Sequence, residues 1–301
     1  MSRPPGVSRA AVVANPVKFG KLQDFRDSVS AAMAKHGWSE PLWLETTPED
    51  PGEGQARTAV QAGVDVVLAS GGDGTVTACA AGLAGSGVPL AIIPAGTGNL
   101  LARNLGLPVD VPAALTVALT GTDRQLDVGM ANGKLFVALA GLGLDAHMVG
   151  GASEPVKKRF GWAAYVVSAL AHIRDRPIRV RLQADGADPL LLQASGVIVG
   201  NIGMLQGGLP LLPDARPDDG RLDLVVLTAR GALSWLVLAA QVVTRRKAAT
   251  GRIFRSTFRE LRVDIDHECP WEIDGEVMGS TRRLVVTVED WKLTLRVAPA
   301  G

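Results

Sequence analysis

Several features that define whole classes of protein are scarce in this chain of 301 residues. It has only two cysteines, Cys79 and Cys269, and no CxxC motif, which argues against a disulfide scaffold or a zinc site and fits a reducing compartment. The formal net charge is +1, so no overall positive field would gather nucleic acid. We therefore expect no nucleic-acid partner.

Long apolar runs are also missing. Residues 1–9 contain no apolar stretch typical of a signal peptide, and no run approaches the roughly 18 apolar residues that cross a membrane. We therefore expect a cytoplasmic protein. Hydrophobic residues still make up 47% of the chain, which is enough to form one large core or two medium ones.

Two glycine-rich turns stand out, Ser70–Thr75 and Pro94–Asn99, because each directly follows a short apolar run. The runs, Val64–Ala69 and Leu90–Ile93, have the composition of buried parallel strands. Turns that follow such strands lie at the sheet edge where open α/β folds bind ligands. Their glycines let backbone N–H groups approach a phosphate closely, although tight structural turns would need the same residues.

The first turn contains a carboxylate, Asp73, which is useful in a phosphate loop chiefly if a cation bridges it to the phosphates. Thr75 and Asn99 are followed by helix-forming residues, so each is expected to begin a helix whose amino end favours negative charge. The spacing of a Walker A loop is absent, as are the signatures of protein kinases.

Strand and helix patterns alternate from residue 10 to about residue 121, which predicts a doubly wound α/β domain over residues 1–127. Besides the two strands before the glycine turns, the expected segments are strands 10–14 and 38–45 and helices 21–36, 53–62 and 112–120.

Beyond residue 127 the pattern changes to short alternating segments, which predicts an antiparallel β-sandwich domain over residues 128–290. Two helix-like inserts, 154–172 and 231–247, interrupt it, and a last alternating run covers 291–297. The expected strands are 135–140, 178–183, 190–199, 222–228, 261–265 and 284–288.

Other polar residues follow expected strands. Asn15-Pro16 ends the first strand and precedes Lys18. These residues are explained equally well by contact with a ligand or by a strand that ends at proline and is followed by a solvated lysine. Thr46 follows the second strand. If Thr46 is the N-cap of a helix, its presence at this position requires no ligand. Asp218-Asp219-Gly220 is an acidic turn of a kind common at hairpins.

A second acidic turn, Asp274-Gly275-Glu276, places two carboxylates around a glycine, and such a pair can divide metal binding and proton transfer between its members. By contrast, the consecutive His267, Glu268 and Cys269 lack a second ligand cluster at zinc spacing.

Together, these motifs resemble the diacylglycerol kinase catalytic family, and in particular its soluble bacterial lipid kinases, which are related to sphingosine kinases. The resemblance extends from about residue 10 to residue 297. The motifs that carry it occur in the family's order: Gly71–Thr75, Pro94–Asn99, Asp214–Asp223 and Asp274–Glu276.

The resemblance implies ATP and Mg²⁺ as cofactors. It implies a magnesium site made by the Asp219 side chain and the carbonyl groups of Arg216 and Arg221, and a carboxyl-terminal strand, about 291–299, that returns to the first domain. The nucleotide-contacting residues that it implies are Asn15, Pro16, Thr46, Gly71, Gly72, Asp73, Gly74, Thr75, Gly96, Thr97, Gly98 and Asn99.

For catalysis, the resemblance favours Glu276 as the base, Asp274 as support for Glu276 or for magnesium, and Asp73 as the group that holds magnesium on phosphate; the roles of Glu276 and Asp274 can be exchanged. The implied activity is transfer of the ATP γ-phosphoryl group to a lipid hydroxyl, with diacylglycerol favoured. An NAD-kinase-like phosphotransferase and a non-catalytic lipid- or nucleotide-binding module are the alternatives.

A lipid substrate requires contact with a membrane surface. The insert 231–247, together with basic and aromatic residues between 157 and 165, would form a patch for the inner membrane face, or else a buried helix that covers the sandwich. We expect no protein partner other than a second copy of the chain.

Overall fold

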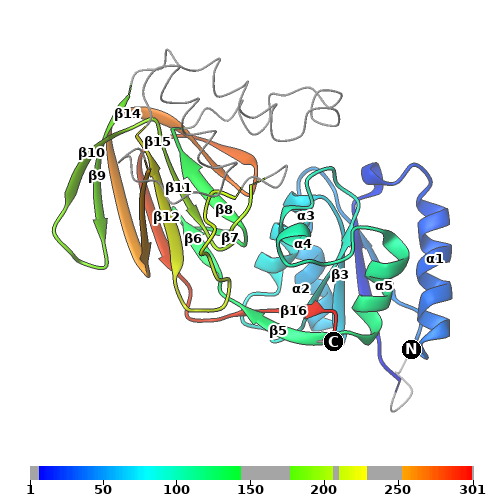
Figure 1. Cartoon of the computed structure of the whole chain (residues 1–301). Coiled ribbons are helices and arrows are strands. Elements are labelled where there is room, and N and C mark those ends of the chain that lie inside the picture. The colour runs from blue at the N-terminus through cyan, green and yellow to red at the C-terminus, as the bar shows by residue number, and fades with distance from the viewer. Residues whose placement is uncertain (1–6, 144–176, 206–209, 229–252, 300–301) are drawn as a thin grey trace. The chain divides into compact units, whose positions relative to one another are not determined.

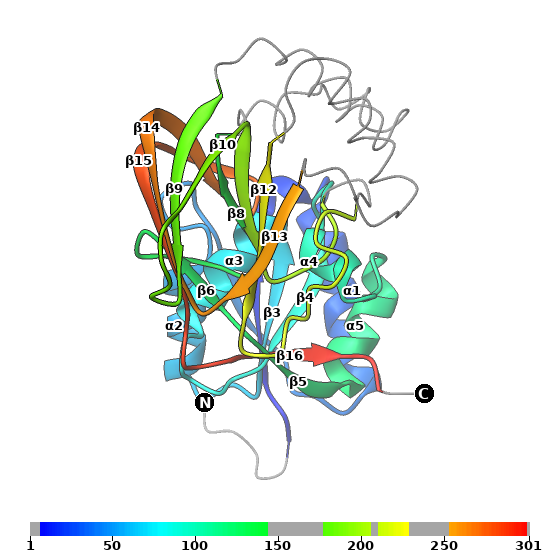
Figure 2. The same ribbon diagram turned by 60° about the vertical axis from the view of Figure 1, so that its left-hand side comes forward.

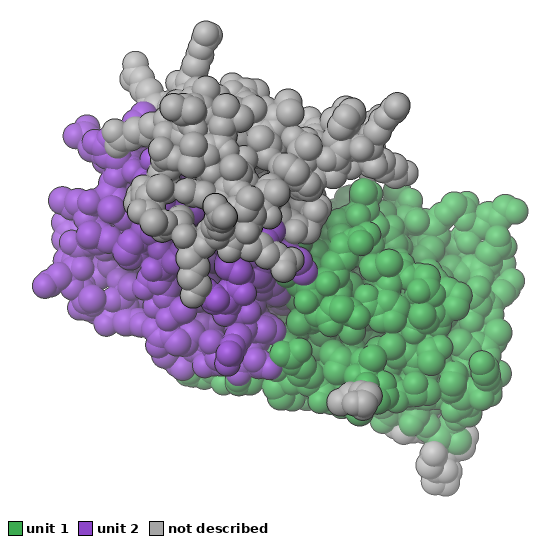
Figure 3. All heavy atoms as spheres, viewed as in Figure 1, with its two compact units in different colours: residues 1–126, 290–301 green, residues 127–289 purple. Residues whose placement is uncertain are grey.

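The computed structural model describes residues 7–143, 177–205, 210–228 and 253–299. The chain divides into two compact units, which Figure 3 distinguishes by colour. Unit 1 comprises residues 1–126 and 290–301, and unit 2 comprises residues 127–289. The predicted fold class, an α/β domain followed by an antiparallel β-sandwich, is confirmed.

Unit 1 is built on a six-stranded sheet in the order β2-β1-β3-β4-β16-β5 (Figure 1). The first four strands of the chain are parallel, β16 is parallel to β4, and β5 is antiparallel to β16. The strands are β1 (Ala10–Ala14), β2 (Leu42–Glu45), β3 (Val66–Gly71), β4 (Leu90–Pro94), β5 (Thr122–Leu126) and β16 (Leu293–Val297).

Helices complete unit 1. The face of α1 that carries Phe25, Val29 and Met33 is buried in one core with residues of α5 and of the central strands, because these side chains recur at helical spacing. The helices are α1 (Leu22–Lys35), α2 (Glu53–Gln61), α3 (Asp73–Gly82), α4 (Leu100–Asn104) and α5 (Val111–Thr120), and a 3₁₀ turn, η1, covers Pro16–Lys18.

Unit 2 is an antiparallel sheet of ten strands, ordered β13-β12-β11-β8-β14-β15-β6-β7, with β9 pairing both β14 and β10 (Figure 2). The strands are β6 (Gly129–Ala131), β7 (Lys134–Phe136), β8 (Leu139–Leu142), β9 (Ile178–Ala184), β10 (Leu190–Ala194), β11 (Gly196–Gly200), β12 (Leu222–Leu227), β13 (Ile253–Phe258), β14 (Glu260–Ile273) and β15 (Glu276–Val288).

Several strands differ from the sequence-based prediction. The run 190–199 is two strands, because β10 pairs β9 whereas β11 pairs β12 and β8. The segments 261–265 and 284–288 are parts of the much longer β14 and β15, whose pairing shifts register between Asp264 and Cys269. That irregularity breaks the alternation by which a strand is recognised.

The predicted inserts 154–172 and 231–247 lie outside the described residues. Among the helices that are described, none is both long enough and apolar enough to cross a membrane.

Candidate active site

The two glycine turns lie side by side at the carboxyl ends of β3 and β4. These strands are parallel neighbours, and the N–H of Ala95 donates to the carbonyl of Gly71 at 2.9 Å. A Cβ atom on Gly96 would lie 2.8 Å from the Cα of Gly72, which is closer than carbon atoms approach. The pairing of the turns therefore requires glycine at position 96.

Asp73 ties the first turn to the helix that follows the second. Its Oδ1 accepts a hydrogen bond of 2.6 Å from the N–H of Leu100, the first residue of α4. Asn99 is the N-cap of α4 in the left-handed conformation, with φ of 47°, and its side chain exchanges hydrogen bonds of 3.1 and 2.9 Å with the main chain of Gly96. The carboxylate of Asp73 thus has a structural task in addition to the predicted cation binding.

The expectation that Thr75 begins a helix is wrong, because α3 begins at Asp73. Gly72 is extended, with φ of −90° and ψ of −173°, so the chain enters the helix two residues earlier and Asp73 lies in its first turn. A carboxylate is favourable there because helix amino ends carry partial positive charge. Thr75 is buried in α3, close to Gly71, and Gly74 lies in the first turn.

The loop after β1 lies near the first glycine turn. The N–H of Asn15 donates to the carbonyl of Ser70 at 2.9 Å. Asn15 is also the N-cap of η1, because its Oδ1 accepts a hydrogen bond of 3.2 Å from the N–H of Val17. The Cε of Lys18 lies 3.8 Å from the place where a Cβ on Gly72 would be. A lysine side chain therefore stands beside the turn.

Thr46 is buried, and its N–H donates to the carbonyl of Ala14 at 2.9 Å. The alternative that Thr46 caps a helix is wrong, because the next helix, α2, has Gly52 as its N-cap. Of the remaining residues of the second turn, Thr97 is exposed, and Gly98 accepts a hydrogen bond of 3.0 Å from the side chain of Arg103.

These contacts bring together groups in unit 1 that favour an anion. The amino end of α3, ten residues long, has no side-chain cap of its own, and Lys18 lies beside it. Uncapped N–H groups, the helix dipole and a nearby cation all favour a phosphate. The geometry therefore supports phosphate binding by Gly72 to Thr75.

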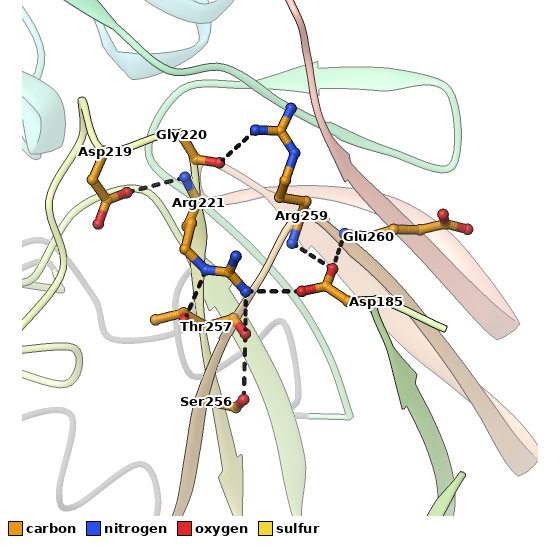
Figure 4. A network of polar contacts seen from close by, with 8 residues as sticks. All are labelled: Asp185, Asp219, Gly220, Arg221, Ser256, Thr257, Arg259 and Glu260. Carbon is orange, nitrogen blue, oxygen red and sulfur yellow. Dashed lines mark hydrogen bonds and ion pairs between the residues drawn. The ribbon is translucent and has the colours of Figure 1, made fainter. Parts of the chain in front are cut away.

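In unit 2, the acidic turn is held in a defined conformation (Figure 4). The Oδ1 of Asp219 accepts a hydrogen bond of 3.0 Å from the N–H of Arg221, and Gly220 between them has φ of +76°. The guanidinium group of Arg221 points to Asp185, at 2.8 Å, and to Thr257. Asp219 lies on the other side of this turn from that guanidinium group, as Figure 4 shows.

The donors available at this turn suit a hard cation. Burial raises the pKa of Asp223 to about 6, and the nearby carboxylates of Asp219 and Asp214 add to this shift. A bound cation would reduce the repulsion between these negative charges. Within the described residues no three side chains of His, Cys, Asp or Glu gather at metal-binding distance. A metal here would therefore need main-chain carbonyl groups, as in the predicted set of Arg216 and Arg221 with Asp219.

Two buried residues that the sequence analysis did not select, Asp127 and Asn201, hold the acidic turn. Asp127 accepts from the N–H of Gly220 at 2.6 Å through Oδ2 and donates its own N–H to the carbonyl of Pro217 at 2.7 Å. The Nδ2 of Asn201 donates to the carbonyl of Asp127 at 2.6 Å. The only signal in the sequence was that Asp127 marks the change of pattern between the domains.

The second acidic turn separates its two carboxylates. Asp274 is buried, with φ of +48°, and its carboxylate accepts three hydrogen bonds of 2.8 to 3.1 Å from the N–H groups of residues 137–139. Glu276, in contrast, is exposed at the start of β15. Asp274 is thus occupied as a main-chain acceptor, whereas Glu276 is accessible to a substrate.

Glu272, on the strand that leads to this turn, was also missed. Its Oε2 is buried without a hydrogen-bond partner, and burial together with the charge of Asp274 raises the pKa of Glu272 to about 7. Nearby, Cys269 is buried, whereas His267 is exposed and contacts Asp266.

Family comparisons agree with this arrangement. The sequence model of the diacylglycerol kinase catalytic domain matches residues 9–131, and that of the YegS C-terminal NAD kinase beta sandwich-like domain matches residues 138–298.

Three relatives illustrate the similarity. A YegS-like lipid kinase of Pseudomonas aeruginosa is 36% identical over 222 residues, which cover 70% of either chain. A diacylglycerol kinase of Mycobacterium tuberculosis is 34% identical over 69% of this chain and 64% of its own. An uncharacterized protein of Synechocystis is 28% identical over 73% of this chain, and the match spans only about half, 52%, of that relative.

Solved structures share the fold. A diacylglycerol kinase-like protein of Bacillus anthracis superposes with a TM-score of 0.76 at 25% identity, covering 98% of this chain and 99% of its own. An NAD kinase of Archaeoglobus fulgidus, solved in complex with ATP, has a TM-score of 0.53 at 14% identity over 96% of this chain and 93% of its own, which is a likeness of fold.

The two domain matches cover both units, and they include the glycine turns and both acidic turns. The chain belongs to the diacylglycerol kinase catalytic family.

Proposed function

We propose that this chain is a magnesium-dependent kinase that transfers the γ-phosphoryl group of ATP to the hydroxyl group of a lipid, with diacylglycerol as the favoured substrate. The observation that carries the proposal is the pairing of the two glycine turns beside the uncapped amino end of α3, with Lys18 close by. A phosphate site at this place is what a chain of the diacylglycerol kinase catalytic family would need.

The residues divide the work as phosphoryl transfer requires, by positioning and by charge neutralisation. The main chain of Gly72, Gly74 and Thr75 and the Lys18 side chain bind phosphate oxygens. Asp219, with the carbonyl groups of Arg216 and Arg221, would hold a magnesium ion, and we assign a second cation to the carboxylate of Asp73. A bound Mg²⁺ would supply positive charge to the phosphates.

The acceptor hydroxyl needs a base, and we assign this role to Glu276. It is the exposed member of the second acidic turn, whereas Asp274 is buried and its carboxylate already accepts three main-chain hydrogen bonds. We assign to Asp274 the task of fixing the turn that presents Glu276.

Two alternatives remain as competing hypotheses. The likeness to the ATP-bound NAD kinase favours NAD as an acceptor, but it is a likeness of fold at 14% identity. A non-catalytic binding module would need neither the acidic turn at Asp219 nor the accessible Glu276.

The test is to incubate the purified chain with labelled ATP and Mg²⁺, with diacylglycerol, a sphingoid base, phosphatidylglycerol or NAD as acceptor, and to identify the labelled product. Phosphatidic acid is the expected product. The variant Glu276→Gln, prepared in parallel, controls for contaminating kinases and must lose the signal. Labelled NADP would support the NAD-kinase alternative, and no product with any acceptor would support a binding module.

A further inference from the structure

The first residues of β15 form the end of the hairpin that carries the proposed base. Asp274 and Gly275, with φ of 48° and 88°, make the two-residue turn between β14 and β15, and Glu276 lies opposite Ile273. From there β14 and β15 lie side by side (Figure 1). The other neighbour of β15, β6, pairs only with Val286–Val288. Within the described part of the chain, no second strand therefore pairs with β15 near Glu276.

The main chain of Val277 faces this open edge. The N–H of Asp274 donates to the carbonyl of Leu139 in β8, and every second residue of a strand turns its main-chain groups to the same neighbour. Glu272, two residues before Asp274, therefore turns its main chain to Gly141 of β8, its partner in that register. The facing pair of Glu272 and Val277 is then of the kind without main-chain hydrogen bonds. As a result, the N–H and C=O groups of Val277 point away from β14.

A β-bulge lies directly after Val277. Trp271 is opposite Gly279 whereas Glu272 is opposite Val277, so Met278 is one extra residue of β15. Gly279 has φ of 114°, a conformation that residues other than glycine rarely adopt. Bulges interrupt regular pairing and thereby protect an edge against the addition of another strand. The edge at Val277 therefore suits a small molecule better than a protein strand.

The side chain of Val277 gives this edge an apolar surface. It is 55% exposed, which makes Val277 one of the few large apolar residues at the surface of the described chain. Glu276 and Val277 are consecutive in a strand, so their side chains lie on opposite faces of the hairpin. A molecule at the edge would meet a carboxylate on one face, an N–H donor in the plane of the hairpin and an apolar side chain on the other face. These groups match a hydroxyl, a carbonyl and a hydrocarbon chain that are close together in one molecule.

We propose that Val277 positions the acceptor lipid. Its main-chain N–H donates a hydrogen bond to an ester carbonyl of the diacylglycerol, its side chain contacts the beginning of an acyl chain, and the free hydroxyl lies at Glu276. This inference rests on the proposed function and adds to it the part of the substrate that is recognised. In the transfer itself, the hydroxyl proton passes to Glu276, the hydroxyl oxygen bonds to the γ-phosphorus of ATP, and ADP leaves; Val277 takes no part in these steps.

The first experiment measures kcat and KM for a water-soluble, short-chain diacylglycerol at saturating ATP and Mg²⁺. Val277→Ala removes two methyl groups from the proposed contact, so KM for the lipid should rise about fivefold, whereas kcat and KM for ATP should stay within about twofold of wild type. The matched control is Val109→Ala, which alters a 45% exposed valine of unit 1 and should leave all three values unchanged. An unchanged KM for the lipid in Val277→Ala would overturn the contact with the acyl chain.

The second experiment tests the hydrogen bond with a matched substrate, a dialkylglycerol whose ether groups replace the esters. The hydroxyl and the chains are kept but the carbonyl groups are lost, so wild type should prefer the ester by about tenfold in kcat/KM. Val277→Pro lacks the N–H, and a strand edge tolerates proline where the N–H points outward. This variant should lose the preference, whereas Val277→Ala, which retains the N–H, should keep it. Equal ester preference in the two variants would overturn the hydrogen bond, with circular dichroism as the control for folding.

The outcomes separate this inference from the function on which it rests. If wild type forms no labelled product with any diacylglycerol, the proposed function fails and the role of Val277 fails with it. If wild type forms phosphatidic acid, but Val277→Ala keeps its KM and Val277→Pro keeps the ester preference, only the role of Val277 is overturned. An altered mass of Val277→Ala in sedimentation, at an unchanged KM for the lipid, would instead identify the edge as a protein contact.

Discussion

The two units build their candidate sites in different ways. In unit 1, the groups that would meet phosphate come from turns after consecutive strands, and glycines hold the turns together by main-chain proximity. In unit 2, long-range hydrogen bonds of buried side chains hold the acidic turns. Asp127 and Asn201 hold the first turn, and Asp274, which belongs to the second turn, accepts from the main chain of residues 137–139. Local order is thus enough for the first site, whereas the second depends on long-range hydrogen bonds.

The sharpest division lies within the second acidic turn, between an accessible and a buried carboxylate. Glu276→Gln is expected to lower lipid phosphorylation by about 100-fold, the usual scale for loss of a general base. Because Glu276 is exposed, the free energy of unfolding should change by less than about 0.5 kcal/mol. Kinetic assays and urea denaturation of the same preparation check both. Activity within about threefold of wild type would remove Glu276 from the role of base.

Asp274→Asn should lower stability more than it lowers activity, the reverse of Glu276→Gln. An amide in place of this carboxylate presents its own N–H₂ group to main-chain N–H donors, so we expect a loss of about 2–3 kcal/mol in the free energy of unfolding. Activity per folded molecule is the decisive quantity, measured after correction for the unfolded fraction. If folded Asp274→Asn is inactive at every Mg²⁺ concentration whereas Glu276→Gln retains activity, the two roles are exchanged.

In unit 1, Asp73→Asn separates the structural task of Asp73 from the electrostatic one. The amide oxygen can still accept the hydrogen bond from Leu100, so the fold should be retained, whereas loss of the charge should lower activity between about 10- and 100-fold. A Mg²⁺ titration of activity, with circular dichroism as the control for folding, tests this. An unchanged plateau would show that the carboxylate serves only to join the two turns.

The glycine turns offer a matched comparison between neighbouring positions. Gly96→Ala would place a Cβ 2.8 Å from Gly72, so the turns must separate and both stability and nucleotide affinity should fall, the first by about 1–2 kcal/mol. At Gly72 the nearest atoms would be 3.8 Å away, so Gly72→Ala should keep its stability and weaken only nucleotide binding.

Gly20→Ala is the control for this pair, because nothing lies within 4 Å of the new atom. Thermal unfolding and ATP titration calorimetry separate the outcomes. If Gly96→Ala and Gly72→Ala changed stability and nucleotide affinity equally, both glycines would be required to make room for a ligand, and not for the packing of the two turns.

The smallest effect concerns Glu272 and depends on pH. Its pKa is about 7 in the folded chain against an ordinary value of 4.5, so the folded state holds the proton more tightly than the unfolded state does. The contribution of Glu272 to stability is therefore greatest at low pH and is lost as the pH rises from about 4.5 to about 7. Glu272→Gln should be about 1–3 kcal/mol more stable than wild type near pH 8, and about equal near pH 4. Urea denaturation at the two pH values tests this, and parallel curves would contradict it.

The same contrast explains what the sequence could predict. Apart from β5, whose sequence is mostly polar, the order of strands and helices in unit 1 and the place of both glycine turns were predictable, because apolar runs and glycines are local signals. Asp127 and Asn201 were not, since a single polar residue after an apolar run reveals its partner only when segments about 75 to 90 residues apart come together. The structural role of Asp73 was missed for the same reason, because its partner Leu100 begins the helix that follows the second glycine turn.

The strand β16 has a consequence for how this chain is made. It lies between β4 and β5 in the sheet of unit 1, yet the whole of unit 2, residues 127–289, precedes it in the sequence. A ribosome must therefore complete unit 2 before the sheet of unit 1 can close, and until then the edges of β4 and β5 stay open to wrong partners. For this chain, unit 1 is the first to be started and the last to be completed.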